Sequence, residues 1–442
     1  MARKRSIAIR FRYVLEYVIF RLLETVIRFV PARWIDSLGW WLGSLAYRLM
    51  PTRRQTVLRN LRMVTDIAPC DQAFHDITRE TFSRAGANLL GGMRCMVMDD
   101  EEIARHVSVE GADLVRETLR SQSQGAVFAL SHMGNWEILA RITALVSPGT
   151  PAGAFYRPLN NPWMNRMTRK RRQQSGTQLF SSKESFSRSC QLLRDGGMLG
   201  ILADQNAGKS GCLTSFFGRP TSCSPLPELL QRRTGAALFY VAMTRDAPAH
   251  WHIRITRHDP QQSISTRSIM QGVEQALALS PADGFWLHDR WKLATRLPLA
   301  TRQSRTELDH RTITKPWRYA LVISATPAIA KAAAPAIDHL IHSLPQAEIH
   351  QIHAAADLDL STTLIALDQQ KNYPLDLVIY FCPELAHQSP HRHTSIDMAA
   401  GFGKSQPSLP CAIPPPPTAM DDPQTWFHLI HSLGCPAPVP SP

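Results

Sequence analysis

One stretch of the chain, residues 125–146, constrains the fold more than any other part of the sequence. It begins with the apolar run GAVFALS (125–131), which has the length and composition of a buried strand. The polar segment HMGNWE follows at once, and the helical pattern EILARITALV comes next. Strand, polar turn and helix in this order form the usual unit of an α/β fold, which presents reactive side chains where a strand ends. We therefore expect an α/β protein whose functional site lies at this turn.

Other apolar runs predict which segments join the same sheet. The segments MLGILA (198–203) and AALFYVAM (236–243) have the composition of buried strands, and WHIRIT (251–256) alternates like a half-exposed strand. Residues before about 120 show helical periodicity with few turn signals, and 267–279 has a helical pattern as well. The sequence thus predicts an α/β domain preceded by helices.

Residues 1–50 are predicted to form amphipathic helices at a membrane interface. The segment 11–30 is strongly apolar, but five charged residues interrupt it, so no charge-free stretch reaches the roughly 20 residues that span a bilayer. The next apolar run, 37–47, is also too short. Charges at helical spacing and the basic start MARKR favour a helix lying on an anionic membrane surface. Peripheral attachment is the expectation. A single N-terminal anchor, or a helix docked on the protein's own core, are the alternatives.

The charge of the chain is uneven and restricts its partners. Residues 315–442 carry six Lys/Arg against ten Asp/Glu, so the net charge of +13 for all 442 residues leaves +17 on residues 1–314. Such a surface attracts an acidic partner, which can be an anionic lipid, a phosphorylated substrate, an acidic protein or a nucleic acid. No helix-turn-helix, RNA-recognition or zinc-finger pattern is present, so nucleic acid is not expected. Eight scattered cysteines without a C-x-x-C pair predict reduced thiols and no metal site.

The segment Ser131–Glu137 carries the chemistry. A His and a Glu at this spacing, His132 and Glu137, can converge where a strand turns into a helix. Glu137 would then hold the imidazole of His132, which could take a proton from an attacking hydroxyl as a general base. Backbone N–H groups at the helix start after Gly134 could stabilise an oxyanion. No G-x-S-x-G elbow and no neighbouring Cys offers a covalent nucleophile.

The segment SHMGNWE, placed after a buried strand, resembles the active-site motif of the late acyltransferases of lipid A biosynthesis, in the lysophospholipid acyltransferase superfamily. Further segments similar to that family follow in order: FYRP (155–158), NP (161–162), R-x-x-x-G (172–176), LRDG (193–196), ADQ (203–205), SFFGRP (215–220) and WLHDRWK (286–292). The resemblance covers roughly residues 10–300.

The resemblance implies a specific reaction. Family members take an acyl chain from an acyl carrier protein thioester, which is a co-substrate, and need no cofactor. They place it on a hydroxyl of a lipid A precursor at the cytoplasmic face of the bacterial inner membrane. The catalytic residues expected are His132 and Glu137. The substrate-binding residues expected are Asn135, Arg157, Arg172, Asp204 and Gln205.

The domain organisation expected has five parts. They are membrane-interface helices at 1–50, an acyltransferase domain at 51–300, a linker at 301–316, a second domain at 317–435 and a Pro-rich tail at 436–442. The 317–435 part reads as a small Rossmann-like βαβ unit and resembles half of an ADP-heptose-type glycosyltransferase. The Gly-Asp that follows the first strand in that family is missing here, and so is the second half, so no glycosyltransferase activity is expected. A metal site at His387, His391 and His393 is a weaker alternative to an exposed loop.

Three other interpretations of the sequence stay open. The chain could acylate another glycolipid or a lysophospholipid, because the motifs describe the acyl-transfer centre more than the acceptor. It could be a basic nucleic-acid-binding protein, although no motif supports this. It could also be an inactive scaffold in envelope biosynthesis that retains the His and Glu.

Overall fold

The structure is a computed structural model that describes residues 7–65, 72–122, 124–181, 185–208, 211–217, 219–288 and 290–291, and parts of 318–397. The chain forms two compact units. The first unit comprises Met1–Val57, Asp76–Gln205 and Pro225–His288, and the second comprises Leu58–His75, Asn206–Ser224 and Asp289–Pro442. The predicted linker (301–316), the Pro-rich tail (436–442) and the three histidines at 387–393 lie outside the described residues.

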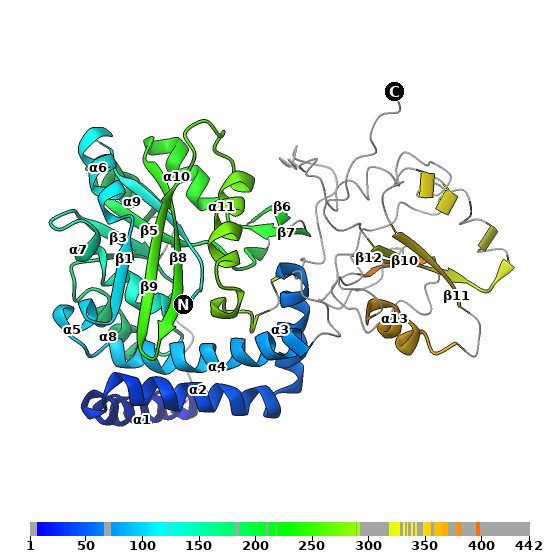
Figure 1. Ribbon diagram of the computed structural model, residues 1–442, viewed down its shortest axis with the longest axis horizontal. Coiled ribbons are helices and arrows are strands. Elements are labelled where there is room, and N and C mark those ends of the chain that lie inside the picture. Colours follow the sequence, from blue (N-terminus) through cyan, green and yellow to red (C-terminus); the bar gives the residue numbers. More distant parts are fainter. Residues whose placement is uncertain are drawn as a thin grey trace. The chain divides into compact units, whose positions relative to one another are not determined.

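The first unit is built on a seven-stranded sheet with the order β1-β9-β8-β2-β5-β3-β4. Figure 1 labels β1, β3, β5, β8 and β9 of this sheet. Its strands are β1 (Val107–Glu110), β2 (Ala126–Leu130), β3 (Ala152–Phe155), β4 (Gln178–Phe180), β5 (Met198–Leu202), β8 (Ala237–Ala247) and β9 (His250–Arg257). Only β8 and β9 run antiparallel to each other, while the other neighbours are parallel. The four strands predicted from the sequence are β2, β5, β8 and β9, so the α/β fold class is confirmed.

Helices cover both faces of this sheet. The helices α9 (Ser185–Arg194), α10 (Leu226–Thr234) and α11 (Thr266–Ala278) pack on one face. The opposite face shares a core with the end of α4 (Gln72–Cys95), with α5 (Asp100–Ala104) and α6 (Ala112–Gln122), and with the turn after β2. Every residue of β2 is buried, because the strand lies in the middle of the sheet between these two layers. This position explains its continuous apolar sequence.

The helix predicted for 137–146 is interrupted. The chain forms a 3₁₀ helix, η1 (Trp136–Ala140), and then a single turn of α7 (Thr143–Val146). Arg141 stands at the break with its guanidinium buried, and it donates to the carbonyl oxygens of Cys95 (2.9 Å) and Met98 (2.8 Å). The guanidinium thus anchors this segment by tertiary bonds that the periodicity alone could not reveal.

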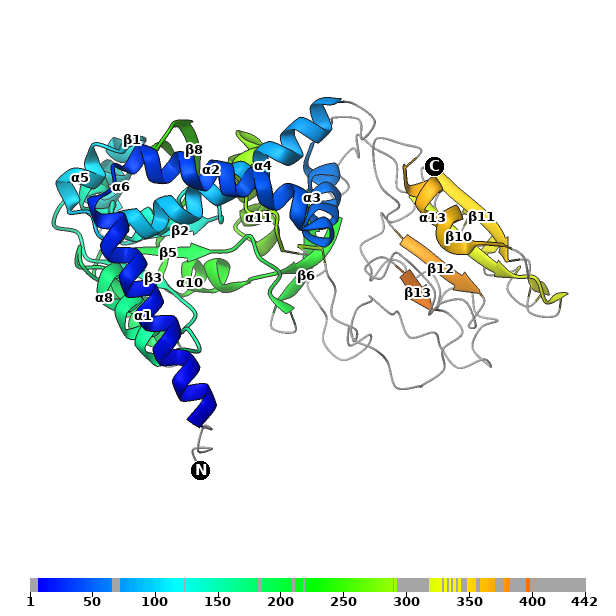
Figure 2. The ribbon, with the colours of Figure 1, turned by 90° about the horizontal axis from the view of Figure 1, so that it is seen from below.

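Four helices precede the sheet: α1 (Ile7–Phe29), α2 (Ala32–Leu49), α3 (Pro51–Val64) and α4 (Gln72–Cys95). α2 and α4 lie side by side below the sheet in Figure 1, and Figure 2 shows the same pairing from another direction. Their backbones touch at glycines. A Cβ on Gly43 would lie 2.1 Å from the Phe82 carbonyl oxygen, and one on Gly86 would lie 2.2 Å from that of Gly39. Side chains at these positions would force the two helices apart.

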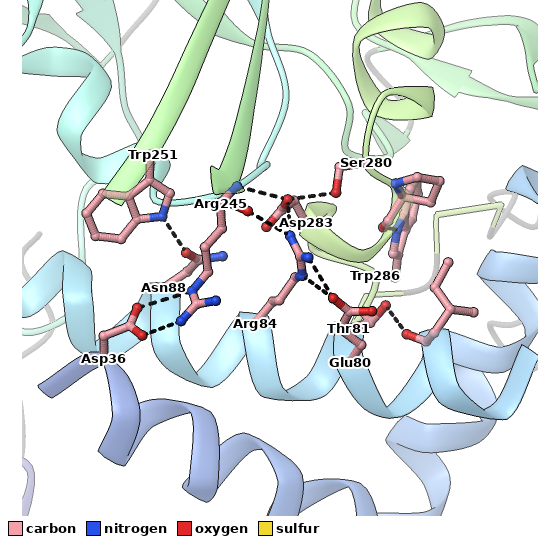
Figure 3. A network of polar contacts seen from close by, with 12 residues as sticks. Asp36, Glu80, Thr81, Arg84, Asn88, Arg245, Trp251, Ser280, Asp283 and Trp286 are labelled. Carbon is pink, nitrogen blue, oxygen red and sulfur yellow. Dashed lines mark hydrogen bonds and ion pairs between the residues drawn. The ribbon is translucent and has the colours of Figure 1, made fainter. Parts of the chain in front are cut away.

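Two buried ion pairs tie α2 to β8 and α4 to the 3₁₀ helix η3 (Pro281–Asp283) (Figure 3). Arg245 of β8 reaches Asp36 of α2 with 2.5 Å between Nη2 and Oδ2, and the Asp36 side chain is fully buried. Arg84 of α4 reaches Asp283 at 2.5 Å between Nη1 and Oδ2, and Ser280 donates to the same oxygen (2.7 Å). Removing one partner of such a buried pair typically costs about 3–5 kcal/mol. α2 and the greater part of α4 are therefore an integral part of the first unit.

The second unit contains a hairpin of β6 (Cys212–Phe216) and β7 (Arg219–Cys223). The fully buried guanidinium of Arg290 donates to Thr221 Oγ1 (2.9 Å) and Cys223 Sγ (3.1 Å) and lies 4.4 Å from the centroid of the Phe216 ring. Arg290 therefore fixes the position of β7 through these contacts. This is a structural role for one residue of the 286–292 segment.

The same unit contains a four-stranded parallel sheet with the order β11-β10-β12-β13. Its strands are β10 (Arg318–Ser324), β11 (Glu348–Ala354), β12 (Leu377–Phe381) and β13 (Ser395–Asp397), and α13 (Leu360–Gln369) lies between β11 and β12 in the chain. Parallel strands joined through a helix match the predicted Rossmann-like unit, which is confirmed. The activity or inactivity of this unit stays a prediction.

Candidate active site

The turn after β2 carries the SHMGNWE segment, and a later segment of the first unit holds its backbone. The N–H of Phe285 donates to the His132 carbonyl (2.8 Å), and the N–H of Gly134 donates to the Asp283 carbonyl (2.9 Å). Gly134 has a φ of +57°, and a Cβ there would lie 2.6 Å from the Met243 carbonyl oxygen. The turn therefore has a fixed shape that requires glycine at this position.

The imidazole of His132 faces Asp204. His132 Nδ1 lies 2.7 Å from Asp204 Oδ1. The two residues meet because β2 and β5 are parallel neighbours with Leu130 opposite Leu202, so that each residue stands two places beyond an aligned strand end. Gln205 follows, with its Nε2 3.3 Å from His132 Nε2. Of the residues predicted for the site, the structure brings His132, Asp204 and Gln205 together.

Asp204 controls the charge of the imidazole. Burial lowers the pKa of His132, but the charge of Asp204 and its hydrogen bond outweigh burial and raise this pKa above its ordinary value of 6.5. Burial raises the pKa of Asp204, and the charge and hydrogen bond of His132 lower it to below its ordinary value. In the neutral imidazole, an N–H at Nδ1 would donate to Asp204 and leave Nε2 as the basic nitrogen.

Glu137 lies elsewhere than expected from the sequence. Its carboxylate accepts two hydrogen bonds from Arg172, from Nε (2.9 Å) and from Nη2 (2.6 Å). This is the bidentate geometry that a guanidinium favours. The carboxylate that hydrogen-bonds the imidazole is that of Asp204, because Asp204 already occupies Nδ1 of His132. Glu137 nonetheless lies close enough for its charge to raise the pKa of His132, less than Asp204 does.

Asn135 is enclosed beneath the turn. It is 1% exposed, and its Nδ2 donates to the sulfur of Cys95 at the end of α4 (3.4 Å). A Cβ on Gly92 of α4 would lie 3.2 Å from Asn135 Oδ1, so only glycine leaves this much room. Burial raises the pKa of the Cys95 thiol to about 12. Cys95 is therefore not an activated nucleophile, and the enclosed position of Asn135 suits support of the turn.

Arg157 is exposed in the segment between β3 and α8 (Pro162–Arg172). Within the part of the chain that the structure describes, its guanidinium makes no hydrogen bond or ion pair. The geometry thus leaves Arg157 available to a ligand but does not bring it to His132.

Two backbone N–H groups of the turn, those of Met133 and Gly134, are already engaged. The N–H of Met133 donates to the Ser131 carbonyl (2.9 Å), and that of Gly134 donates to Asp283. The helix that follows is the five-residue η1 rather than a long α-helix, so the expected helix dipole is small. An oxyanion site at the N–H groups after Gly134 therefore stays a prediction.

Two aromatic rings lie beside the imidazole. The Trp136 ring meets His132 edge-on, with 5.2 Å between centroids, and Phe285 meets Trp136 at 5.3 Å. The His132 side chain remains 16% exposed, so a substrate atom can approach it. Within the described residues, no group of three His, Cys, Asp or Glu is arranged to hold a metal ion.

The N-terminal helices present an apolar surface, here called the apolar face. On α1 it comprises Phe11, Val14, Leu15, Val18, Ile19, Leu22, Leu23, Val26 and Phe29, and on α2 it comprises Trp34, Leu38, Trp41, Leu42 and Leu49. All are more than a third exposed, whereas Glu24 on the opposite side of α1 is 3% exposed. A surface helix with its apolar side outward is typical of a lipid or protein interface. Among the described helices, none has a long enough apolar stretch to cross a bilayer.

Comparison with known proteins shows which family the chain resembles. A lipid A biosynthesis lauroyltransferase of Escherichia coli (strain K12) is 25% identical over 289 residues, which are 64% of this chain and 92% of that protein. A phosphatidylinositol mannoside acyltransferase of Mycolicibacterium smegmatis is 25% identical over 241 residues, which are 53% of this chain and 78% of that protein. The model of the bacterial lipid A biosynthesis acyltransferase family matches residues 4–293, which include the sheet and the His132 turn, and this chain belongs to that family.

Proposed function

We propose that the protein transfers an acyl chain from an acyl carrier protein thioester to a hydroxyl of a lipid A precursor, with His132 as general base. The observation that carries this proposal is the 2.7 Å contact between His132 Nδ1 and Asp204 Oδ1. A carboxylate in this position fixes the tautomer of an imidazole and stabilises its protonated form. Asp204 thereby takes the orienting role that the sequence assigned to Glu137.

The reaction follows from this pair. The acceptor hydroxyl gives its proton to His132 Nε2 while its oxygen attacks the thioester carbonyl carbon. The tetrahedral intermediate then collapses, the C–S bond breaks, and the imidazolium returns the proton to the thiolate leaving group. The Gln205 amide, 3.3 Å from Nε2, marks a place where a polar group can bond to that nitrogen. In this proposal the acceptor hydroxyl replaces the amide.

Charge supports the choice of partners. An acyl carrier protein is acidic and a lipid A precursor is phosphorylated, and both would be attracted to a segment with a net charge of +17. The last turn of α8 holds four consecutive basic residues, Arg169 to Arg172. Arg171 and Arg172 are engaged by acidic side chains, so Arg169, Lys170 and the exposed Arg157 are the better candidates for anionic groups. No nucleic-acid partner is proposed.

The function is tested with purified protein in detergent micelles. The donor is a lauroyl thioester of acyl carrier protein, and the acceptors are a tetra-acylated lipid A precursor and a phosphatidylinositol mannoside. We expect transfer to the lipid A precursor to be at least tenfold faster than to the mannoside, as differential binding of one acceptor allows. Transfer only to the mannoside would mean that the acceptor is another glycolipid and not a lipid A precursor. No transfer to either would favour the inactive scaffold.

The second acceptor is included for a specific reason. The mannoside acyltransferase relative is as similar in sequence as the lauroyltransferase, at 25% identity each. A substrate pocket for either glycolipid is therefore compatible with the shared acyl-transfer centre.

We also propose that the apolar face of α1 and α2 attaches the protein to the cytoplasmic face of the bacterial inner membrane. Serine at Leu22 and Phe29, which are 64% and 81% exposed, is expected to reduce binding to anionic vesicles at least tenfold. Sedimentation with vesicles measures this, and Leu279→Ser, at an exposed position after α11 (52%), is the control. Equal binding of the two proteins would show that this face does not meet lipid.

A further inference from the structure

We infer that Glu24 and Arg171 are positioning residues of the active site. By joining α1 to α8, they fix the place of Arg172, and through it the carboxylate of Glu137 beside His132. The inference rests on the proposed function, in which His132 is the base. It gives α1 a second role besides attachment to a membrane.

The first link between α1 and α8 is a buried ion pair. Glu24 is 3% exposed on a helix whose outer side is apolar. Its Oε1 lies 3.0 Å from Arg171 Nη2, and its other oxygen pairs with Arg21 of the same helix. A carboxylate this deeply buried is stable only beside its cationic partners, so α1 cannot shift along α8 without a large cost in free energy.

The second link between α1 and α8 lies at the other end of α8. Asn161 caps this helix, and its Oδ1 accepts from the N–H groups of Trp163 (3.1 Å) and Met164 (3.4 Å). Its Nδ2 donates to the Tyr13 carbonyl (2.9 Å) and to Glu16 Oε2 (3.0 Å) on α1. Both ends of the 11-residue α8 are therefore attached to α1, and Figure 2 shows the two helices side by side.

The connection to the active site passes through adjacent residues. Consecutive side chains of an α-helix point about 100° apart, so Arg171 and Arg172 bind different residues. Arg171 binds Glu24, whereas Arg172 binds Glu137 through two hydrogen bonds of 2.9 and 2.6 Å. A bidentate pair tolerates little displacement of the guanidinium. The position of α1 thus determines how firmly Glu137 is held, and Glu137 acts on the charge of His132.

The test replaces Glu24 by glutamine, which keeps the shape and removes the charge. We expect the kcat of Glu24→Gln to fall about threefold to tenfold, no more than that of Glu137→Gln, because Glu24 acts only by positioning that group. The KM for the acyl carrier protein thioester is expected to stay within about twofold, since Glu24 contacts no substrate. Glu117→Gln, an exposed carboxylate on α6, is the matched control and should behave like the wild type. Vesicle binding should be unchanged in both.

A double-mutant cycle separates positioning from general destabilisation. In a Glu137→Gln background, Glu24→Gln should lower kcat by less than about twofold, because coupled residues are not additive. Asn161→Asp is the second variant, for the case in which Glu24→Gln does not fold. It keeps the acceptor that caps α8 but loses both bonds to α1. It should reproduce the loss in kcat. Full additivity, or a Glu24→Gln enzyme as active as Glu117→Gln, would overturn the inference.

A readout that needs no turnover distinguishes this inference from the proposed function. Histidine titration by NMR, with His132 assigned from the His132→Ala spectrum, measures the pKa of His132 directly. Glu24→Gln should change this pKa, because Glu137 raises it and Arg172 lowers it, and both lose their fixed position in the variant. If the wild type transferred no acyl chain while this shift was present, the proposed function would fail and the positioning role would stand. An unchanged pKa in a folded Glu24→Gln protein would refute the positioning role.

Discussion

Replacing His132 by alanine is expected to lower acyl transfer by about 10²–10⁴-fold, the range that a positioned general base contributes. The imidazole is the group that both contacts a buried carboxylate and remains open to a substrate atom, at 16% side-chain exposure. With alanine, the acceptor hydroxyl would have to lose its proton to water. Steady-state rates with saturating thioester measure the effect on kcat.

The control for this experiment is His250→Ala. His250 lies at the start of β9 and pairs with Asp246 in a contact that is partly open to solvent. It tests whether loss of any His–Asp pair in the first unit impairs the enzyme. An enzyme with His132→Ala that keeps more than a tenth of the wild-type rate would remove His132 from the mechanism.

The sheet could be predicted because its central strands are apolar without interruption. β2, β5 and β8 lie between two helical layers, so burial on both faces leaves a signal in each segment. The short strands leave a weaker signal in the sequence. β1, β3 and β4 have three or four residues, and only tertiary pairing distinguishes them from loops. The break at Arg141 was also not predictable, because its guanidinium bonds to carbonyls of residues far away in the sequence.

The sequence predicted three residues that the structure brings together, His132, Asp204 and Gln205, but it did not predict the contact between His132 and Asp204. Proximity in the sequence suggested Glu137 as the partner of His132, although a strand order would have suggested Asp204. Once β2 and β5 are known to be parallel neighbours, residues two places beyond Leu130 and Leu202 must meet. A single sequence gives no strand order, and so no evidence for this contact. The link between Glu137 and Arg172 depends on α8 in the same way.

The N-terminal segment shows a similar limit. Its interrupted apolar pattern predicted amphipathic helices, and α1 and α2 are such helices. The charged residues looked alike in the sequence, yet Glu24 is buried while Arg12 and Glu16 form a largely exposed pair. Which charge faces solvent depends on where α8 packs, and this is tertiary information.

Replacing Asp204 by asparagine is expected to produce a loss about as large as that of His132→Ala, about 10²–10⁴-fold in kcat, because the imidazole loses the group that fixes its tautomer. Glu137→Gln should cost less, about tenfold, since Glu137 has no hydrogen bond to the imidazole and acts on it only through its charge. The two variants keep side-chain volume, so their difference reports on charge and hydrogen bonding. A larger loss in Glu137→Gln than in Asp204→Asn would restore the dyad first expected from the sequence.

The pH dependence of kcat/KM shows in which direction Asp204 shifts the pKa of His132. His132 acts as a base only when neutral, so kcat/KM of the wild type should rise with pH through a pKa above 6.5. In Asp204→Asn the carboxylate that stabilises the imidazolium is gone and burial remains, so the pKa of His132 must fall. The acidic limb then moves to lower pH while the plateau drops, two changes that unfolding would not produce together. A limb that stays in place or moves to higher pH would mean that Asp204 does not hold the catalytic imidazole.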